Sequence, residues 1–93
     1  MSIILYTQTN CAFCDIMKEK LDKTGFSYYT INIQESASAL AFMKKQGHRT
    51  VPQLYVQDKH VNKKNTQDYS VDELYKLIEE ASDSWPWQDS GIE

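Results

Sequence analysis

The sequence lacks several features that would place it in other classes of protein. It has only two cysteines among 93 residues, and its net charge of -3 leaves no broad basic surface for nucleic acid or an anionic membrane. No positively charged segment followed by a long apolar run stands at the start, which predicts neither a signal peptide nor a membrane span. We therefore expect a cytoplasmic protein that acts on neither nucleic acid nor membranes.

The remaining composition is that of one ordinary globular domain. Hydrophobic residues make up 41% and charged residues 25% of the chain, which is enough for a modest core. No internal repeat, low-complexity run or linker precedes residue 82, so the domain is predicted to span residues 1–82. Residues 83–93 hold Trp85 and Trp87 around Pro86, and we expect an irregular tail there that packs against the surface.

Both cysteines fall in one short motif. Cys11 and Cys14 stand where the apolar run from Ile3 to Tyr6 changes into a helical pattern. A Cys-x-x-Cys pair at a strand-to-helix junction indicates a thiol–disulfide redox centre, and in the cytosol a lone pair is more plausibly catalytic than a crosslink. Cys11 would lie at the helix N-terminus, where unpaired N–H groups and the helix dipole favour a thiolate. Cys14 would lie beneath it, where an internal disulfide can close.

Two other uses of the cysteine pair fit the sequence less well. A structural zinc site normally has four protein ligands, and His48 and His60 are the only further candidates and do not form a compact histidine pair in the sequence. Two buried, unreactive thiols would more often be scattered through a core than placed on one turn. We therefore predict no metal site.

Hydrophobic periodicity predicts four strands and three helices. Clusters of β-branched and aromatic residues predict strands over 2–7, 26–33, 53–57 and 60–61. Apolar residues at helical spacing predict helices over 12–24, 36–46 and 70–81. In the first helix, the predicted inward face consists of Phe13, Ile16, Met17 and Leu21.

Several local signals mark where these elements end. Gly25 and Gly47 are predicted to end the first two helices. Ser70 and Glu73 form the pattern of a capping box at the start of the third helix, and Asp58 with Lys59 is a predicted turn.

This order of elements predicts an α/β fold. A strand–helix–strand unit requires a right-handed parallel connection, and the two closing strands suit an antiparallel hairpin. We expect a four-stranded mixed sheet with three helices packed on both faces.

Several motifs together resemble those of glutaredoxins, small dithiol redoxins with the thioredoxin fold. The resemblance covers residues 2–81. A Cys-x-x-Cys motif alone is only moderately specific, but joined to Thr-Val-Pro at this separation and in this element order it is strong. The motifs are Tyr6-Thr7, Cys11-Ala-Phe-Cys14 with Lys18, Gly47-His-Arg-Thr-Val-Pro52 and Gln53-Leu-Tyr-Val56.

The resemblance implies a particular site. It assigns catalysis to Cys11 and Cys14, and it implies a cis peptide bond between Val51 and Pro52 beside them. The backbone of Val51 would then be free to pair with an extended peptide or with glutathione. Contacts with substrate or glutathione are expected at Gln8, Phe13, Arg49, Thr50, Val51, Pro52 and Lys63.

The chain departs from the family around this site. Gln8 stands where a basic residue is common, Phe13 where tyrosine is frequent, and Ala39 where an amide or arginine often holds a glutathione carboxylate. Asn62-Lys-Lys-Asn-Thr-Gln-Asp68 replaces a Gly-Gly-x-Asp-Asp segment whose glycines let the backbone approach the ligand. We therefore expect weakened glutathione binding. Replacement positive charge would come from Arg49, Lys44 or Lys63.

Three further expectations concern the loop and the histidines. Lys63 and Lys64 would make the rim of the substrate-binding groove beside the cysteines attractive to an acidic protein segment. Glycines at positions 62 and 63 would improve glutathione binding. His48 and His60 are interpreted as turn or strand-edge residues without a catalytic partner.

The function that follows is thiol–disulfide exchange, in which Cys11 attacks a substrate disulfide and Cys14 resolves the mixed disulfide. By resemblance, glutathione is the expected electron donor, as a co-substrate and not as a tightly bound cofactor. Expected protein substrates carry disulfides or bound glutathione, for example a ribonucleotide reductase, and we expect a monomer. Two alternatives stay open: recharging by a thioredoxin-type reductase, and an iron–sulfur cluster held between two protomers, which Ala12 in the proline-free motif would permit.

Overall fold

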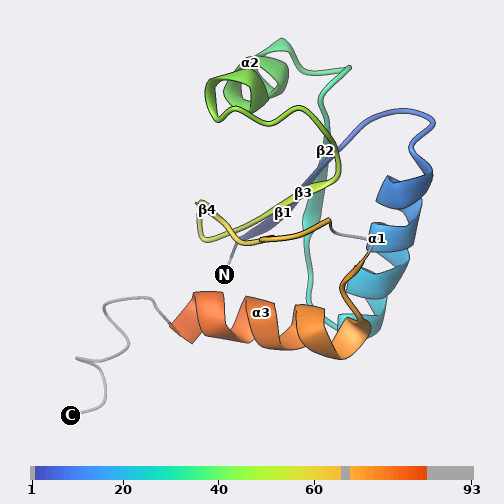
Figure 1. Ribbon diagram of the computed structural model, residues 1–93, viewed down its shortest axis with the longest axis vertical. Coiled ribbons are helices and arrows are strands. Elements are labelled where there is room, and N and C mark those ends of the chain that lie inside the picture. Colours follow the sequence, from blue (N-terminus) through green and yellow to red (C-terminus); the bar gives the residue numbers. More distant parts are fainter. Residues whose placement is uncertain (1, 66–67, 84–93) are drawn as a thin grey trace.

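The computed structural model describes residues 2–65 and 68–83, and Figure 1 shows their arrangement. The predicted tail with Trp85 and Trp87 lies outside the described residues. No helix within these ranges is both long and apolar enough to cross a membrane. The elements follow the predicted order: β1 (Ile3–Thr7), α1 (Ala12–Thr24), β2 (Tyr29–Asn32), α2 (Ala37–Lys45), β3 (Gln53–Val56), β4 (Lys59–His60) and α3 (Val71–Asp83).

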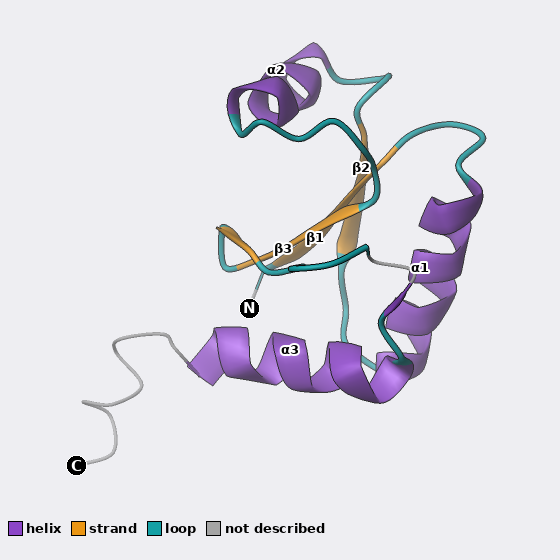
Figure 2. Cartoon of the chain, viewed as in Figure 1, coloured by secondary structure: helices purple, strands orange, loops and turns teal. Residues whose placement is uncertain are grey.

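The four strands form one mixed sheet in the order β2-β1-β3-β4. β1 is parallel to β2, with Tyr6 opposite Ile31, and α1 makes the crossover that a parallel pair requires. β1 is antiparallel to β3, and β3 is antiparallel to β4. α2 covers one face of the sheet, and α1 and α3 cover the other (Figure 2). The predicted mixed sheet with helices on both faces is thus confirmed.

The main core lies between the sheet and the helices α1 and α3. Side chains alternate along a strand, so the opposite face of the sheet carries Tyr6 and Tyr55, which pack against Phe42 of α2. Burying one large apolar side chain stabilises the fold by roughly 1.5–3 kcal/mol. The core on the α1 and α3 side makes the larger contribution to stability, because it holds more fully buried side chains. Its fully buried side chains are Ile3, Leu5, Met17, Leu21, Leu54, Val56, Leu74 and Ile78.

The buried face of α1 differs from the predicted one. Phe13 and Ile16 are 50% and 39% exposed, and the buried stripe consists of Cys14, Met17 and Leu21. The two stripes have nearly the same helical spacing, and the packing of α1 against the sheet and α3 selects between them. As a result, the Phe13 ring is exposed next to the cysteine pair.

Strand boundaries also differ from the prediction, chiefly at the β3–β4 turn and at the start of β2. The turn between β3 and β4 consists of Gln57 and Asp58, one residue earlier than predicted, with φ angles of 54° and 65°. Two consecutive left-handed residues match a type I′ hairpin turn, whose twist suits antiparallel strands. β2 begins only at Tyr29. The preceding Tyr28 turns toward α1, where its hydroxyl donates to the Asp22 carboxylate at 2.8 Å.

The helix ends follow the sequence signals. Gly25 adopts a φ of 84° after α1, a left-handed conformation that glycine enters without a Cβ penalty. Ser36 caps α2 by accepting the Ala39 N–H at 3.2 Å. Ser70 and Glu73 form the predicted capping box before α3, because each side chain accepts the other residue's backbone N–H.

Candidate active site

Cys11 and Cys14 form a disulfide, and their Cα atoms lie 5.2 Å apart. Cys11 is the N-cap of α1 and is half-buried, whereas Cys14 lies in the first helical turn and is 1% exposed. This difference in exposure favours Cys11 as the sulfur that an incoming disulfide reaches.

The start of α1 favours a negative charge on the Cys11 sulfur. Its Sγ accepts the backbone N–H of Cys14 at 3.1 Å. Unpaired N–H groups and the helix dipole stabilise an anion at this end of a helix, so the geometry favours the thiolate once the pair is reduced. The Lys18 ammonium lies 4.0 Å from the Asp15 carboxylate, at the limit of an exposed ion pair.

The loop between β1 and α1 is held by two side chains, one from the last residue of β2 and one from just after it. The Asn32 amide donates to Thr9 Oγ1 at 3.0 Å, and the Gln34 side chain accepts the Thr9 N–H at 3.1 Å. Asn10 adopts a φ of 58°, a left-handed conformation in which asparagine is enriched. These contacts position the residue immediately before Cys11. Sequence reasoning missed them, because only the parallel pairing of β1 with β2 brings these polar groups together.

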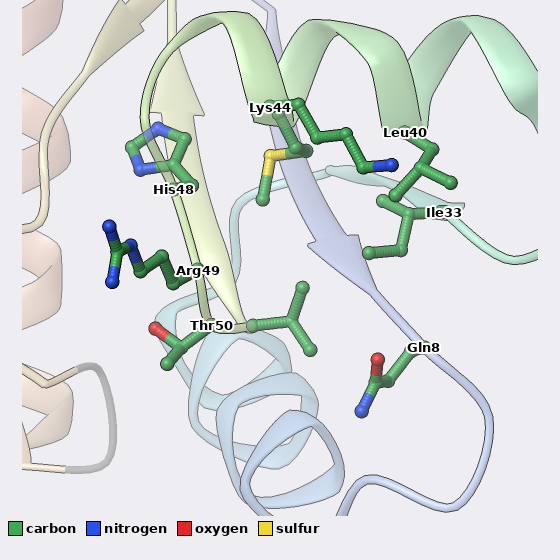
Figure 3. Close-up of a pocket in the computed structure, with 9 residues that line it drawn as sticks. Gln8, Ile33, Leu40, Lys44, His48, Arg49 and Thr50 are labelled. Atoms are coloured by element: carbon green, nitrogen blue, oxygen red, sulfur yellow. The ribbon is translucent and has the colours of Figure 1, made fainter.

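A pocket of about 440 Å³ opens between α2 and the segment that precedes Pro52 (Figure 3). Its volume is within the range of small-molecule sites. It lies next to the redox loop, because Gln8 comes only three residues before Cys11. The lining residues are Gln8, Ile33, Leu40, Met43, Lys44, His48, Arg49, Thr50 and Val51.

This first pocket combines an apolar floor with basic groups. Leu40 and Met43 come from one face of α2, and the Lys44 side chain extends over the floor (Figure 3). Arg49 projects away from Gln8 in the same view. Lys44 is therefore better placed than Arg49 to meet an anionic group of a ligand in this pocket.

A second cavity of about 200 Å³ adjoins the same segment. Since Phe13 immediately precedes Cys14, this cavity connects the redox pair with the loop that starts at residue 62. The peptide bond between Val51 and Pro52 is cis, as the resemblance implies. The lining residues are Phe13, Thr50, Val51, Pro52, Gln53, Asn62, Lys64 and Asn65.

The two pockets bring together most of the residues predicted to contact substrate. Thr50 and Val51 line both pockets, whereas Lys63 lines neither of them. The neighbouring Lys64 lines the second cavity, and Lys44 lines the first. Gln8 and Arg49 line the first pocket, and Phe13 and Pro52 line the second.

Asn62 stands where the resemblance places a glycine, and its side chain is built into the sheet. Its Nδ2 donates to Gln53 Oε1 at 3.0 Å, and its Oδ1 accepts the backbone N–H of Leu54 at 2.9 Å. The Leu54 N–H would otherwise lack a partner at the short end of β4. At this position the flexible glycine that the resemblance implies is therefore replaced by an asparagine whose side chain makes its own hydrogen bonds to the sheet.

The lysines after Asn62 are also held by local contacts. The Lys63 N–H donates to the Tyr69 hydroxyl at 2.9 Å. The Lys64 ammonium lies 4.7 Å from the centre of the Tyr69 ring and 3.5 Å from the Glu73 carboxylate. Much of the charge of Lys64 is thus directed at α3, which weakens the case for it as a free contact for an acidic protein segment.

His48 and His60 lie together, with ring centroids 4.5 Å apart. His48 Nε2 is 2.8 Å from the Tyr55 hydroxyl, and His60 Nε2 is 2.8 Å from Gln53 Oε1. Burial, and then the neighbouring His48, lower the pKa of His60 below its usual value of 6.5. His48 lies at the end of the turn after α2 and His60 lies on β4, as interpreted. Their pairing was missed, because only the folded sheet brings them together.

Comparisons with known proteins agree with this geometry. The family model described as Glutaredoxin matches residues 3–61. Glutaredoxin 1 of Rickettsia typhi (strain ATCC VR-144 / Wilmington) is 33% identical over 79 residues, which cover 82% of this chain and 69% of that protein.

Solved structures of redoxins share the fold. The structure of NrdH-redoxin from Escherichia coli, described as a glutaredoxin-like protein with a thioredoxin-like activity profile, gives a TM-score of 0.60 at 29% identity, over 62% of this chain and 76% of that one. A buckwheat glutaredoxin-glutathione complex gives 0.57 at 22% identity, over 85% of this chain and 69% of that one. The predicted thioredoxin fold is confirmed.

Proposed function

The chain belongs to the glutaredoxin family and is a thiol–disulfide oxidoreductase, and on that premise we propose that glutathione recharges its cysteine pair as a co-substrate. The observation that carries this proposal is the first pocket, which joins an apolar floor to the ammonium of Lys44 beside the redox loop. A carboxylate of glutathione would find a charge-assisted partner there. Further support comes from the buckwheat glutaredoxin, whose structure is described as a complex with glutathione.

Substrate reduction proceeds by two successive sulfur displacements. The Cys11 thiolate attacks one sulfur of a substrate disulfide, so that a mixed disulfide forms and the other substrate sulfur leaves as a thiolate. The Cys14 thiolate then attacks the Cys11 Sγ, which closes the internal disulfide and releases the second substrate thiolate. Both released thiolates take protons from water. The substrate gains two electrons and the cysteine pair loses two.

Glutathione returns those two electrons. One glutathione thiolate attacks the Cys11 Sγ, and Cys14 leaves as a thiolate. A second glutathione attacks the glutathione sulfur of the mixed disulfide, giving glutathione disulfide and the Cys11 thiolate. In this proposal the first pocket holds the tripeptide, with Gln8, Thr50 and Val51 along its wall.

A thioredoxin-type reductase is the second candidate donor. The Escherichia coli NrdH-redoxin is described as having a thioredoxin-like activity profile. The Asn62 side chain also occupies a position that glycine would leave open for the γ-glutamyl end of glutathione. Under this alternative the reductase attacks the internal disulfide directly, and protein disulfides, such as that of a ribonucleotide reductase, are the substrates.

A coupled assay separates the two donors. NADPH oxidation is followed on one protein disulfide, with glutathione and glutathione reductase in the first arm and thioredoxin reductase alone in the second. We expect turnover in the first arm, weakened by Lys44→Gln and unaffected by Lys45→Gln, since Lys45 lines neither pocket. Turnover in the second arm without turnover in the first would overturn the glutathione proposal in favour of the alternative.

A further inference from the structure

We propose that Gln53 is a positioning residue, whose side-chain amide sets the orientation of the peptide group between Thr50 and Val51 and so the way a peptide-like substrate is held beside Cys11. The inference rests on the role that the family resemblance implies for the Val51 backbone, pairing with a peptide or with glutathione, and it names what holds that backbone in place. Gln53 is a polar side chain at the start of β3, yet it is only 8% exposed.

Every polar group of the Gln53 amide has a partner. Its Nε2 donates to the Thr50 carbonyl oxygen at 3.0 Å and lies 3.4 Å from the Thr50 Oγ1. Its Oε1 accepts from Asn62 Nδ2 at 3.0 Å and lies 2.8 Å from His60 Nε2. A carbonyl oxygen only accepts, so the contact with Thr50 decides which end of the amide is nitrogen. A buried amide without such partners is unfavourable, and the four contacts therefore define one orientation of Gln53.

The same reasoning assigns the proton on His60. Because Gln53 Oε1 is an acceptor, His60 must donate from Nε2. Neutral imidazole with its proton on Nε2 and charged imidazolium both provide this donor. The anchor of Gln53 is therefore kept in both protonation states of His60, and titration of the histidine is not expected to release the loop.

The contact with Thr50 acts on the substrate side through the planarity of the peptide bond. The Thr50 carbonyl and the Val51 N–H belong to one rigid group and point in opposite directions. Holding the carbonyl toward Gln53 thus fixes the direction of the N–H. Within residues 2–65 and 68–83 the Val51 N–H has no hydrogen-bond acceptor, and Val51 lines both pockets. A substrate backbone carbonyl is the group that this donor would receive.

The other end of Gln53 is anchored to the sheet. His60 lies on β4 opposite Tyr55, and Asn62 is itself tied to the Leu54 N–H. One continuous set of contacts therefore runs from the β3–β4 hairpin through Gln53 to the Thr50 carbonyl. Without it, the peptide group before the cis bond is free to rotate, and substrates that use the Val51 N–H lose a fixed donor.

The test compares two disulfides in single-turnover reactions of the prereduced protein, so that no recharging donor takes part. One is a short peptide with a single cysteine, joined by a disulfide to 2-mercaptoethanol; the other is bis(2-hydroxyethyl) disulfide, which has no peptide group. Gln53→Met keeps the length of the side chain and removes its hydrogen bonds. We expect the rate constant for the peptide disulfide to fall roughly tenfold, with little change for the small disulfide. Gln46→Met, at the exposed end of α2, is the matched control.

Gln53→Glu provides a readout that a merely structural role would not move. It keeps an oxygen acceptor toward Asn62 and replaces the donor that faces the Thr50 carbonyl by an oxygen. The introduced carboxyl donates to that carbonyl only when it is protonated. The ratio of the two rate constants should therefore recover as pH falls through its titration, and the ratio cancels the changing thiolate fraction of Cys11.

Two results would count against the inference, and a third would count against the function on which it rests. Rate constants for both disulfides that are unchanged in both variants would overturn the positioning role. An equal loss on both disulfides, without recovery at low pH, would assign Gln53 to stability alone. Inactivity of the unmodified protein on both disulfides would instead overturn the oxidoreductase function, and this result is distinguishable from the other two.

Discussion

The backbone N–H of Cys14 donates to the Sγ of Cys11 across 3.1 Å. This contact directs a partial positive charge at the more accessible sulfur, while the Cys14 side chain itself is buried. These differences within one turn of helix support the proposed division of tasks, in which Cys11 attacks and Cys14 resolves.

Replacing each cysteine by serine should separate these tasks. Cys11→Ser is expected to abolish disulfide reduction. In Cys14→Ser, the Cys11 thiolate should still attack the substrate disulfide, and a mixed disulfide should accumulate on Cys11, because no second cysteine is present to release it. Intact-protein mass spectrometry detects the adduct. In the reduced unmodified protein, faster alkylation of Cys14 than of Cys11 at neutral pH would contradict the assignment.

Lys44 provides the test of the first pocket. Lys44→Gln removes the ammonium over the apolar floor and should raise the KM for glutathione roughly tenfold, the effect of one charge-assisted hydrogen bond. The kcat should change little, because Lys44 takes no part in the proposed sulfur displacements. Steady-state kinetics with varied glutathione measure both constants. Lys45→Gln is the control, and an equal effect of the two substitutions would point to net charge alone.

Asn62→Gly restores the residue that the family resemblance places there. Sequence reasoning expects glycines at positions 62 and 63 to improve glutathione binding, whereas the contacts of Asn62 lead us to expect the opposite for this single substitution. Asn62 supplies partners for Gln53 and for the Leu54 N–H, so its loss should destabilise the fold by roughly 1–3 kcal/mol and raise the KM for glutathione. Chemical denaturation and steady-state kinetics check the two effects separately. An unchanged denaturation midpoint with a lower KM would support the original expectation.

Glu73 links the start of α3 to pH. The backbone hydrogen bond from Ser70, and then the charge of Lys64, lower the pKa of this carboxyl below its ordinary value of 4.5. A lowered carboxyl pKa stabilises the fold above 4.5, and that contribution is lost as pH falls through the folded value. Glu73→Gln keeps an acceptor for the capping box without the charge, so its deficit in Tm should be steady near neutral pH and shrink in acid. Thermal melts across this range measure the deficit, and one that does not depend on pH would refute the assignment.

His60 is expected to titrate below the ordinary value of 6.5, chiefly because it is buried and then because of His48. A lowered pKa means that the unfolded chain binds the proton more readily, so this residue reduces stability as pH falls below 6.5. His48→Gln should raise the pKa of His60 while leaving it below 6.5, since burial remains. NMR titration of the imidazole Hε1 resonance follows both proteins. A midpoint at or above 6.5 in the unmodified protein would be inconsistent with this environment.

Much of the fold was predictable because its signals are local. The capping box at Ser70 and Glu73, the glycine after α1 and the strand–helix spacing each act within a few residues, and they agree with the topology. The redox centre was predictable for the same reason, since Cys11 and Cys14 are near neighbours in the chain.

The remaining features depend on contacts between distant segments. Periodicity alone does not decide whether Phe13 or Cys14 begins the buried stripe of α1, because the two positions are adjacent and α3 makes the choice. Nor does composition tell Lys44 from Lys63, since both are basic and only the folded chain places one in the pocket. The partners of Gln53 are another case, because the hairpin must form before His60 reaches it.

The Gln53 amide also limits the routes by which this sequence can change. A substitution at position 53 alone leaves the Asn62 amide nitrogen without its acceptor, and one at position 62 alone removes one of the two contacts of Gln53 Oε1. The two positions should therefore show epistasis, with the double substitution less damaging than the sum of the single ones. We therefore expect positions 53 and 62 to be replaced together in evolution. A sequence that lost only one of the two residues would be less stable until the other changed or the first was restored.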